Sequence, residues 1–450
     1  MGALLLLLLS FSAFAQADAP VEPKKAKWTV MVYMDGDSAN EFLRRNDIED
    51  MIRGQEEGSD DVRVIALFDR NNNEKEKPLY KNEYQLKDWN GARIIECKKQ
   101  SYETLEVIGD VNLAAPKPLL TFVNRAIAKA PAEKYALIFG GEGFGWTGMN
   151  GNKGSSREDW LTLTELGGAL NEIKKLHGKL DLIHFDNSFM GSVETAVVVA
   201  HNSKWMSASA GYRWSKGADY RVVLAGLNEN PDMDGKSLGR IIIGSCIIDN
   251  SRYNLKVGWL SFILLDCEQV PALVTKLKAL EDAIYSSYLA ERDENSPKKY
   301  AKWVAHINDA LAGSLRYRGL IERPTTADEP IDLLQFCKKL QSLDAESKLT
   351  VTSTEEVIQQ LTKTIVETKY FAGVSQDGAL GLSINIPIVT KEKLSGSNFA
   401  AYQKELALFD EGGEYKNTLF SKLTNWSRWI WFYYMTSGLD SMVAERRQNH

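Results

Sequence analysis

Short, almost continuous apolar runs alternate with amphipathic segments along the first 266 residues of the chain. Four of these runs are "WTVMVY", "DVRVIALF", "YALIF" and "LDLIHF", at residues 28–33, 61–68, 135–139 and 180–185. Strands that are apolar on both sides are buried on both faces, as in a parallel sheet with helices above and below it. The alternation therefore predicts an α/β fold with a mostly parallel sheet flanked by helices.

After about residue 266 the pattern changes, and amphipathic stretches follow one another with few strand-like runs between them. We expect a largely helical C-terminal region, with helices that include residues 270–292 and 354–368. One late strand is expected over residues 378–387, in "GALGLSINIP". The aromatic run at residues 426–434 recurs at helical spacing, so we expect it to pack on the core.

The chain opens on a Leu-rich stretch followed by small residues, "MGALLLLLLSFSAFAQADAP". This pattern predicts a signal peptide over residues 1–15 with cleavage after Ala15, and the stretch is too short to span a membrane. A polar linker over residues 16–27 follows, then the α/β domain over 28–266 and the helical region over 267–450. We expect an exported protein, secreted or periplasmic, with no membrane span.

The charge balance argues against one class of partner, nucleic acid. There are 54 basic and 60 acidic residues, which gives a net charge of −6, and no Lys/Arg stripe is interleaved with aromatic residues. This composition predicts no binding to nucleic acid. The sequence does not determine the oligomeric state.

No cofactor and no metal are expected. The four cysteines are widely spaced among apolar residues, without a C-x-x-C or Cys/His cluster, which favours buried thiols over a zinc site. They are Cys97, Cys246, Cys267 and Cys337. An oxidising compartment would allow one disulfide, whose partners the sequence does not specify. The segment "DGDSANE" at residues 35–41 lacks the calcium-loop pattern, and we interpret it as a turn followed by a helix.

Ligands of open α/β sheets lie beyond the carboxyl ends of the strands, so the polar strand ends are the candidate site. They are Asp35–Asp37, the glycine-rich turn at 140–146 with Glu142, and Asp186-Asn187-Ser188. Ser188 stands at the end of a strand and shortly before a helical segment, where α/β enzymes present a nucleophile. Consecutive strands of such units are usually neighbours, which would place Glu142 beside Ser188.

Several motifs together resemble one family, the clostripain-like cysteine peptidases, which have a caspase-like α/β fold. They are "VMVYMDGDS", "YALIFGGEGFGW", "LDLIHFDNSFMGSVETA", "SASAGYRWSKGADY", "LSFILLDCEQVPAL" and "GLSINIP". They occur in the family's order and extend from about Trp28 to Pro387. The set is specific as a whole, although single motifs are weak.

The resemblance implies roles for three residues. In the family, a His in the glycine turn is the general base and a Cys in the Asp-x-Cys motif is the nucleophile. Glu142 and Ser188 stand at these two positions. Asp186 stands where the family has the acidic residue that lines the specificity pocket for Arg or Lys side chains.

Both substitutions weaken the catalytic chemistry. A Ser hydroxyl ionises much less readily than a Cys thiol, and Glu, with an ordinary pKa of about 4.3, is a weak base near neutral pH. The leading hypothesis is therefore a degenerate pseudo-peptidase that binds basic side chains of peptides or proteins at Asp186. The alternatives are an active endopeptidase that cleaves after Arg or Lys with Ser188 and Glu142, and a structural or scaffolding export protein with a filled cleft, with which the bulky Phe144 and Phe189 are compatible. For Ser188 itself a further interpretation is an unrelated role, in which it only caps the helix that follows.

Overall fold

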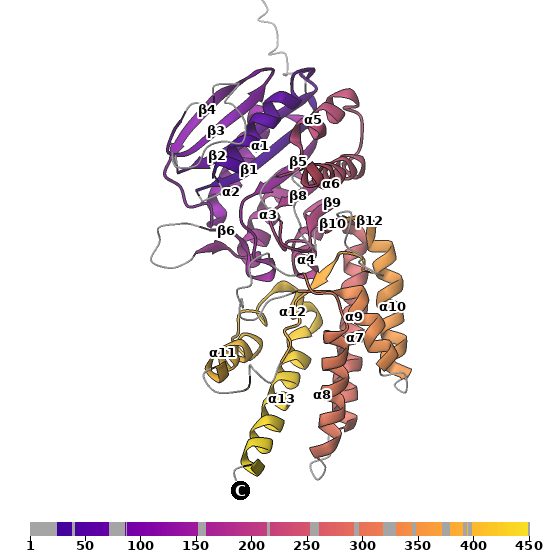
Figure 1. Ribbon diagram of the computed structural model, residues 1–450. Coiled ribbons are helices and arrows are strands. Elements are labelled where there is room, and N and C mark those ends of the chain that lie inside the picture. Colours follow the sequence, from indigo (N-terminus) through magenta and orange to yellow (C-terminus); the bar gives the residue numbers. More distant parts are fainter. Residues whose placement is uncertain are drawn as a thin grey trace, which may run out of the picture.

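The structure is a computed structural model, and it describes residues 25–37, 41–71, 86, 88–151, 159–213, 217–252, 261–291, 297–317, 330–343, 348–370, 379–389, 394 and 398–448 (Figure 1). The predicted signal peptide and most of the linker lie outside these residues. The division of the chain at residue 266 stays a prediction.

Nine strands of the described chain form one central sheet. In their order across the sheet they are β12 (Ile365–Tyr370), β10 (Ser261–Asp266), β9 (Ser203–Ser209), β8 (Leu180–Asp186), β5 (Ala132–Gly140), β1 (Ala26–Gly36), β2 (Val62–Arg70), β3 (Gly91–Lys98) and β4 (Ser101–Gly109). The five strands from β9 to β2 pair in parallel, and the outer strands pair antiparallel. The predicted mostly parallel sheet is confirmed.

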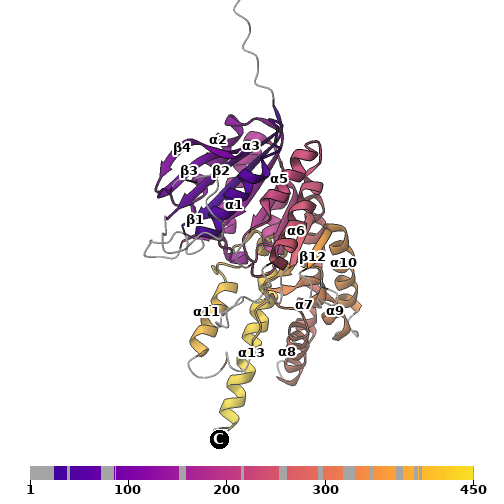
Figure 2. The same cartoon turned by 45° about the horizontal axis from the view of Figure 1, so that its top comes forward.

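Helices cover both faces of the sheet. On one face lie α1 (Glu41–Gly54), α5 (Tyr220–Glu229) and α6 (Gly235–Arg252), which Figure 2 shows side by side, and on the other lie α2 (Pro116–Lys129), α3 (Leu163–His177) and α4 (Val193–Ala200). Successive residues of a strand point to opposite faces. In β1, Val30 and Val32 join the core under α1, whereas Met31 and Tyr33 join the core under α2 and α3. This is why the strand is apolar throughout.

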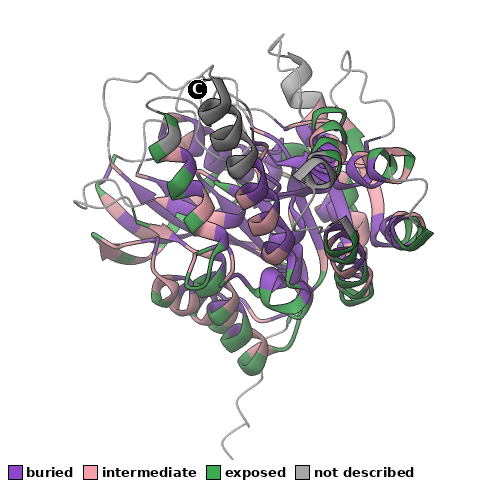
Figure 3. Cartoon of the chain, turned by 90° about the horizontal axis from the view of Figure 1, so that it is seen from below, coloured by how far each residue is buried: buried purple, intermediate pink, exposed green. Residues whose placement is uncertain are grey.

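The C-terminal region is largely helical and extends from one end of the sheet (Figure 1). Its helices are α7 (Val270–Glu291), α8 (Pro297–Ala312), α9 (Leu333–Leu343), α10 (Lys348–Thr364), α11 (Phe399–Phe409), α12 (Leu419–Thr424) and α13 (Trp426–Gln448). The strands from β10 to β3 are buried along most of their length, whereas the outer faces of these helices are exposed (Figure 3). Trp426, Trp429, Tyr433 and Tyr434 are fully buried, as the aromatic run predicted.

Two sequence-based expectations for this region are wrong in detail. The helix expected over residues 354–368 ends at Thr364, and Ile365–Tyr370 continues as the edge strand β12, antiparallel to β10. The β-branched residues at 365, 366 and 368 favour a strand once a free sheet edge is beside them. The strand expected over residues 378–387 is much shorter in the structure. It is β13 (Ser383–Ile384), which pairs with β11 (Ile331–Asp332) outside the central sheet.

Short elements lie around the ends of the central strands. They are η1 (Gly145–Thr147), the hairpin of β6 (Met149–Gly151) and β7 (Trp160–Leu161), and η2 (Cys267–Gln269). All four cysteines are buried free thiols, and burial raises the pKa of Cys97 to about 12. Among the helices that the structure describes, none has the length and apolar character to cross a membrane.

Candidate active site

The glycine turn and the Ser188 turn lie against each other, because the strands before them are neighbours. β5 and β8 pair in parallel with Gly140 opposite Asp186. The approach is so close that a Cβ on Gly143 would lie 2.2 Å from the main-chain oxygen of Ser188. Asn187 joins the turns, since its Nδ2 donates to the Glu142 carbonyl at 2.9 Å. The structure therefore brings these two predicted strand ends together.

Glu142 lies half-buried in this turn, and its charge reaches residues from two other strand ends. The pKa of Tyr212 is raised, first by burial and then by the negative charge of Glu142. The same charge contributes to raising the pKa of Asp35. Next to it Phe144 is partly exposed and packs its ring 4.7 Å from the ring of Trp160. Glu142 thus lies within electrostatic reach of Tyr212 and Asp35.

Ser188 is buried, and only 5% of its surface is exposed. Within the described residues both hydrogen bonds of its Oγ go to the main chain of Arg213. The Oγ accepts from the Arg213 N–H at 2.9 Å and donates to the Arg213 carbonyl at 3.4 Å. The hydroxyl is therefore held by the backbone of a neighbouring loop.

The interpretation of Ser188 as a helix cap is wrong. The helix α4 begins at Val193, and its cap is Ser192, whose Oγ accepts from the Thr195 N–H at 3.2 Å. Between Ser188 and this cap the chain makes a further turn, in which Phe189 has a φ of 62°. That extra turn separates Ser188 from the helix N-terminus.

Asp186 is fully buried, and its carboxylate is enclosed by the segment after β9. The Arg213 guanidinium forms an ion pair with it, and the Tyr220 hydroxyl donates to its Oδ2 at 2.7 Å. Gly217 packs so tightly here that a Cβ would lie 2.2 Å from Asp186 Oδ2. Asp186, the acidic residue of the expected specificity pocket, is therefore already paired with a basic side chain of the same protein, that of Arg213.

Arg213 is the residue of this site that sequence reasoning missed. It lies in the "SASAGYRWSKGADY" motif, directly after β9, and β9 is the neighbour of β8. An arginine just beyond the end of a strand beside β8 is the signal that points to it. The rule that consecutive strands are neighbours would have placed Arg213 next to Asp186.

His184 does not replace the missing base. It is fully buried in β8, where its Nδ1 lies 2.9 Å from Ser207 Oγ and its Nε2 lies 3.5 Å from Asp186 Oδ1. Burial, helped by the positive charge of Arg213, lowers the pKa of His184 to about 3. A histidine of such low basicity is a poor proton acceptor at neutral pH.

Three residues of this site are of metal-binding types, but they do not fit a metal. Potential ligand atoms of His184, Asp186 and Cys246 lie within 4.8 Å of one another. The Arg213 guanidinium is in contact with the same carboxylate and lies 3.9 Å from Cys246 Sγ. It already supplies the positive charge, and a metal cation beside it would be strongly repelled.

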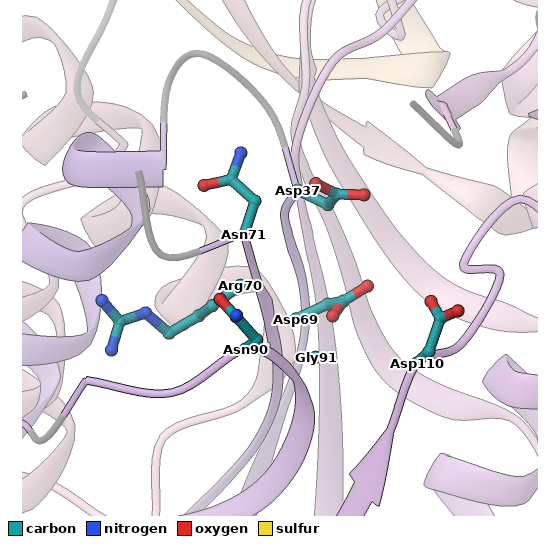
Figure 4. Close-up of a pocket in the computed structure, with 7 residues that line it drawn as sticks. All are labelled: Asp37, Asp69, Arg70, Asn71, Asn90, Gly91 and Asp110. Atoms are coloured by element: carbon teal, nitrogen blue, oxygen red, sulfur yellow. The ribbon is translucent and has the colours of Figure 1, made fainter. Parts of the chain in front are cut away.

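A second group of carboxylates lies at the ends of β1 and β2. Burial raises the pKa of Asp35 to about 7, and the charges of Asp37 and Glu142 add to this effect. The pKa of Asp69 rises to about 7 for the same reason. Asp37, Asp69 and Asp110 line a polar pocket of about 230 Å³ (Figure 4). Asp35 and Asp69 therefore titrate near neutral pH.

This titration gives a testable dependence of stability on pH. The pKa of Asp35 is about 7 in the folded protein and about 3.8 in the unfolded chain, so between these values the folded state retains a proton that the unfolded state releases. The stability from this group is complete below the unfolded pKa and is lost as the pH rises through about 7. His184, with its lowered pKa, acts in the opposite direction, so the effect must be isolated with a variant.

We expect Asp35→Asn, which cannot ionise, to gain stability relative to the wild type as the pH rises from about 4.5 to about 8. The expected gain is about 2–4 kcal/mol, because one pKa unit corresponds to about 1.4 kcal/mol. Urea denaturation of both proteins at several pH values measures it. If the difference in free energy of unfolding between Asp35→Asn and the wild type stays constant with pH, the raised pKa of Asp35 is contradicted.

The fold defines a class of protein, the α/β proteins with a caspase-like fold. The described structure is similar to that of a secreted C11 cysteine protease from Bacteroides thetaiotaomicron in complex with an irreversible peptide inhibitor. The TM-score is 0.60 and the sequence identity 16%, with 89% of this chain and 99% of that chain covered. It is also similar to an inactive zymogen C11 protease from Parabacteroides distasonis, with a TM-score of 0.59, 14% identity, and 90% and 99% of the two chains covered. At this identity the likeness concerns the fold.

A sequence profile described as the clostripain family matches residues 32–431, and the chain belongs to that family. Clostripain from Hathewaya histolytica is 27% identical over 246 residues, which are 46% of this chain and 44% of that protein. The matched segment thus spans less than half the length of that relative. The predicted family and its caspase-like fold are confirmed. The roles of Ser188, Glu142 and Asp186 stay predictions.

Proposed function

We propose that this clostripain-family protein is a catalytically degenerate pseudo-peptidase that binds peptides or proteins at its former active-site face. The observation that carries the proposal is the state of Ser188. Both hydrogen bonds of its Oγ within the described residues go to the main chain of Arg213. A nucleophilic Ser needs a base that takes its proton, and here the proton is directed to a peptide carbonyl.

Other potential bases and nucleophiles among the described residues support the same conclusion. Glu142 stands in the place of the family's histidine, and His184 is buried with a lowered pKa. Burial raises the pKa of Cys97 to about 12, and it raises those of Cys267 and Cys337 as well. A buried thiol that does not ionise is chemically inert. These residues leave no efficient nucleophile and base pair.

The proposal includes export of the protein. It rests on the signal-peptide pattern of residues 1–15, with cleavage after Ala15. The similar protease from B. thetaiotaomicron is itself described as secreted. N-terminal sequencing of the mature protein tests this, and Gln16 is the expected first residue.

The experiment on catalysis uses the chain from Gln16 onward and fluorogenic peptides with Arg, Lys or a neutral residue before the reporter. We expect no turnover above that of Ser188→Ala at any pH between about 4 and 9, because no base activates the hydroxyl. Turnover that the Ser188→Ala variant loses would overturn the proposal.

One observation favours the second candidate, an active endopeptidase that cleaves after Arg or Lys. The charges of Asp35 and Glu142 interact, and the pKa of Asp35 is about 7. A pair of coupled carboxyl groups is the arrangement that carries acid–base chemistry in acidic hydrolases. This candidate requires activity that is highest at acid pH and disappears in both Ser188→Ala and Glu142→Gln, so the same assay distinguishes the two functions.

A further inference from the structure

One residue, Arg213, engages both Ser188 and Asp186. Its main-chain N–H donates to Ser188 Oγ at 2.9 Å, and its guanidinium forms an ion pair with the Asp186 carboxylate. In a peptidase that recognises basic side chains, the recognised residue places its side chain on a pocket carboxylate and its main chain beside the nucleophile. Arg213 occupies both places at once.

The surroundings of the Arg213 side chain suit a guanidinium group. Asp186 supplies the negative charge, and the Tyr220 hydroxyl donates to the same carboxylate at 2.7 Å and fixes its orientation. The guanidinium carbon lies 5.4 Å from the centre of the Phe262 ring, within cation–π range. His184 beside it has a lowered pKa and is neutral, so it does not compete for Asp186 as a cation.

Within the described residues, Gly217 packs closely against the Asp186 carboxylate and the Arg213 side chain is buried. Only 8% of the Arg213 surface is exposed, and Gly217 leaves no room for a side chain over Asp186. Gly217 is itself fixed, because its N–H donates to Asp47 Oδ1 at 3.2 Å. An external basic side chain can reach Asp186 only if the Arg213 side chain leaves.

We propose that Arg213 is an internal ligand of the Asp186 pocket, and that its side chain competes there with external basic side chains. This inference rests on the proposed function, since it concerns the same site of a protein that binds without cleaving. It names the residue that controls access to Asp186.

The test is chemical rescue of Arg213→Ala in the mature chain. The substitution removes the side chain beyond Cβ but leaves the main-chain contact with Ser188. N-ethylguanidinium replaces the missing atoms, and N-ethylurea is its uncharged control. We expect Arg213→Ala to melt at a lower temperature than the wild type, because it leaves a buried carboxylate without its cation. N-ethylguanidinium at millimolar concentration should restore part of the loss and bind with one-to-one stoichiometry in calorimetry, whereas N-ethylurea should do neither.

Two further variants define the site. In Arg213→Ala/Asp186→Asn the affinity for N-ethylguanidinium should fall at least about tenfold, because the charge that holds it is gone. The wild type should not bind the probe, since its own arginine fills the site. A basic peptide should bind Arg213→Ala more tightly than the wild type.

Equal affinity of Arg213→Ala and the double variant for N-ethylguanidinium, or absence of binding to Arg213→Ala, would overturn the proposal. If Arg213→Ala does not fold alone, it is refolded with and without N-ethylguanidinium. Recovery of folded protein only in the presence of N-ethylguanidinium would support the proposed pocket, and no recovery would contradict it. The probe has no peptide bond, so this result is independent of whether the protein hydrolyses peptides. Failure of the pseudo-peptidase proposal would instead appear as Ser188-dependent turnover.

Discussion

Restoring the family's residues at both predicted catalytic positions, with Ser188→Cys and Glu142→His together, is expected to create peptidase activity at least about a hundredfold above either single variant. Residues of a catalytic dyad act as a unit, so neither change suffices alone. A Cys thiol beside a His forms the thiolate that a Ser hydroxyl does not. The two turns are already in contact, since a Cβ on Gly143 would lie 2.2 Å from the Ser188 carbonyl oxygen.

The measurement is cleavage of Arg- and Lys-containing fluorogenic peptides at neutral pH by the double variant, both single variants and the wild type. The double variant should also form a covalent adduct with a thiol-directed peptide inhibitor, which Ser188→Ala cannot form. Adding Arg213→Ala to the double variant should raise its activity on basic peptides by a further factor of about ten, because Asp186 becomes accessible. A well-folded double variant without activity would show that the site has lost more than its two catalytic side chains.

The second large effect concerns stability and the residue Asp332. Asp332 is fully buried and accepts four hydrogen bonds, from the Tyr317 hydroxyl at 2.9 Å and from the main-chain N–H groups of Gln335, Leu380 and Gly381 at 3.0, 3.1 and 2.9 Å. Burial raises its pKa, although each of these donors favours the charged form. This carboxylate therefore joins α9 to the segment before β13.

Asp332→Ala should lower the free energy of unfolding by at least about 4 kcal/mol, because each buried donor left without a partner costs about 1–3 kcal/mol. Asp332→Asn should also lower the free energy of unfolding. Both carboxylate oxygens of Asp332 accept hydrogen bonds, whereas the amide of Asn would turn its NH₂ group, a donor, toward one set of these donors. Urea denaturation followed by circular dichroism measures both effects.

The matched control is Asp410→Ala. Asp410 is an exposed carboxylate that accepts one main-chain N–H, from Glu411 at 2.7 Å, so its loss should cost about 1 kcal/mol or less. The two aspartates thus differ in burial and in the number of donors. Similar decreases in the free energy of unfolding for Asp332→Ala and Asp410→Ala would contradict the stabilising role of Asp332.

Asp332 also connects stability to the candidate site. The segment that it holds continues into β13, where the Ser383 N–H donates to the Gly191 carbonyl at 3.0 Å. Gly191 lies in the turn that follows Ser188. The C-terminal region therefore supports the Ser188 turn directly, which the predicted division of the chain at residue 266 did not suggest.

The sequence by itself determined the fold class and the strand ends that form the candidate site. Both follow from local patterns, since apolar runs such as Val30–Tyr33 specify strands buried on both faces, and the polar residues after them mark the strand ends. The contact between the Glu142 and Ser188 turns was also predictable, because consecutive parallel strands are usually neighbours.

The tertiary structure decided what local patterns do not encode. Ile365–Tyr370 follows a helix with no break in its pattern, and only the open edge of β10 makes it a strand. Likewise, the sequence marks Asp186 as an acid at a strand end, but it does not show whether that acid faces solvent or a cation. The packing of Arg213, Gly217 and Tyr220 around Asp186 settles this. A buried carboxylate is strongly destabilised unless a positive charge and hydrogen bonds compensate it, and Arg213 and Tyr220 supply both.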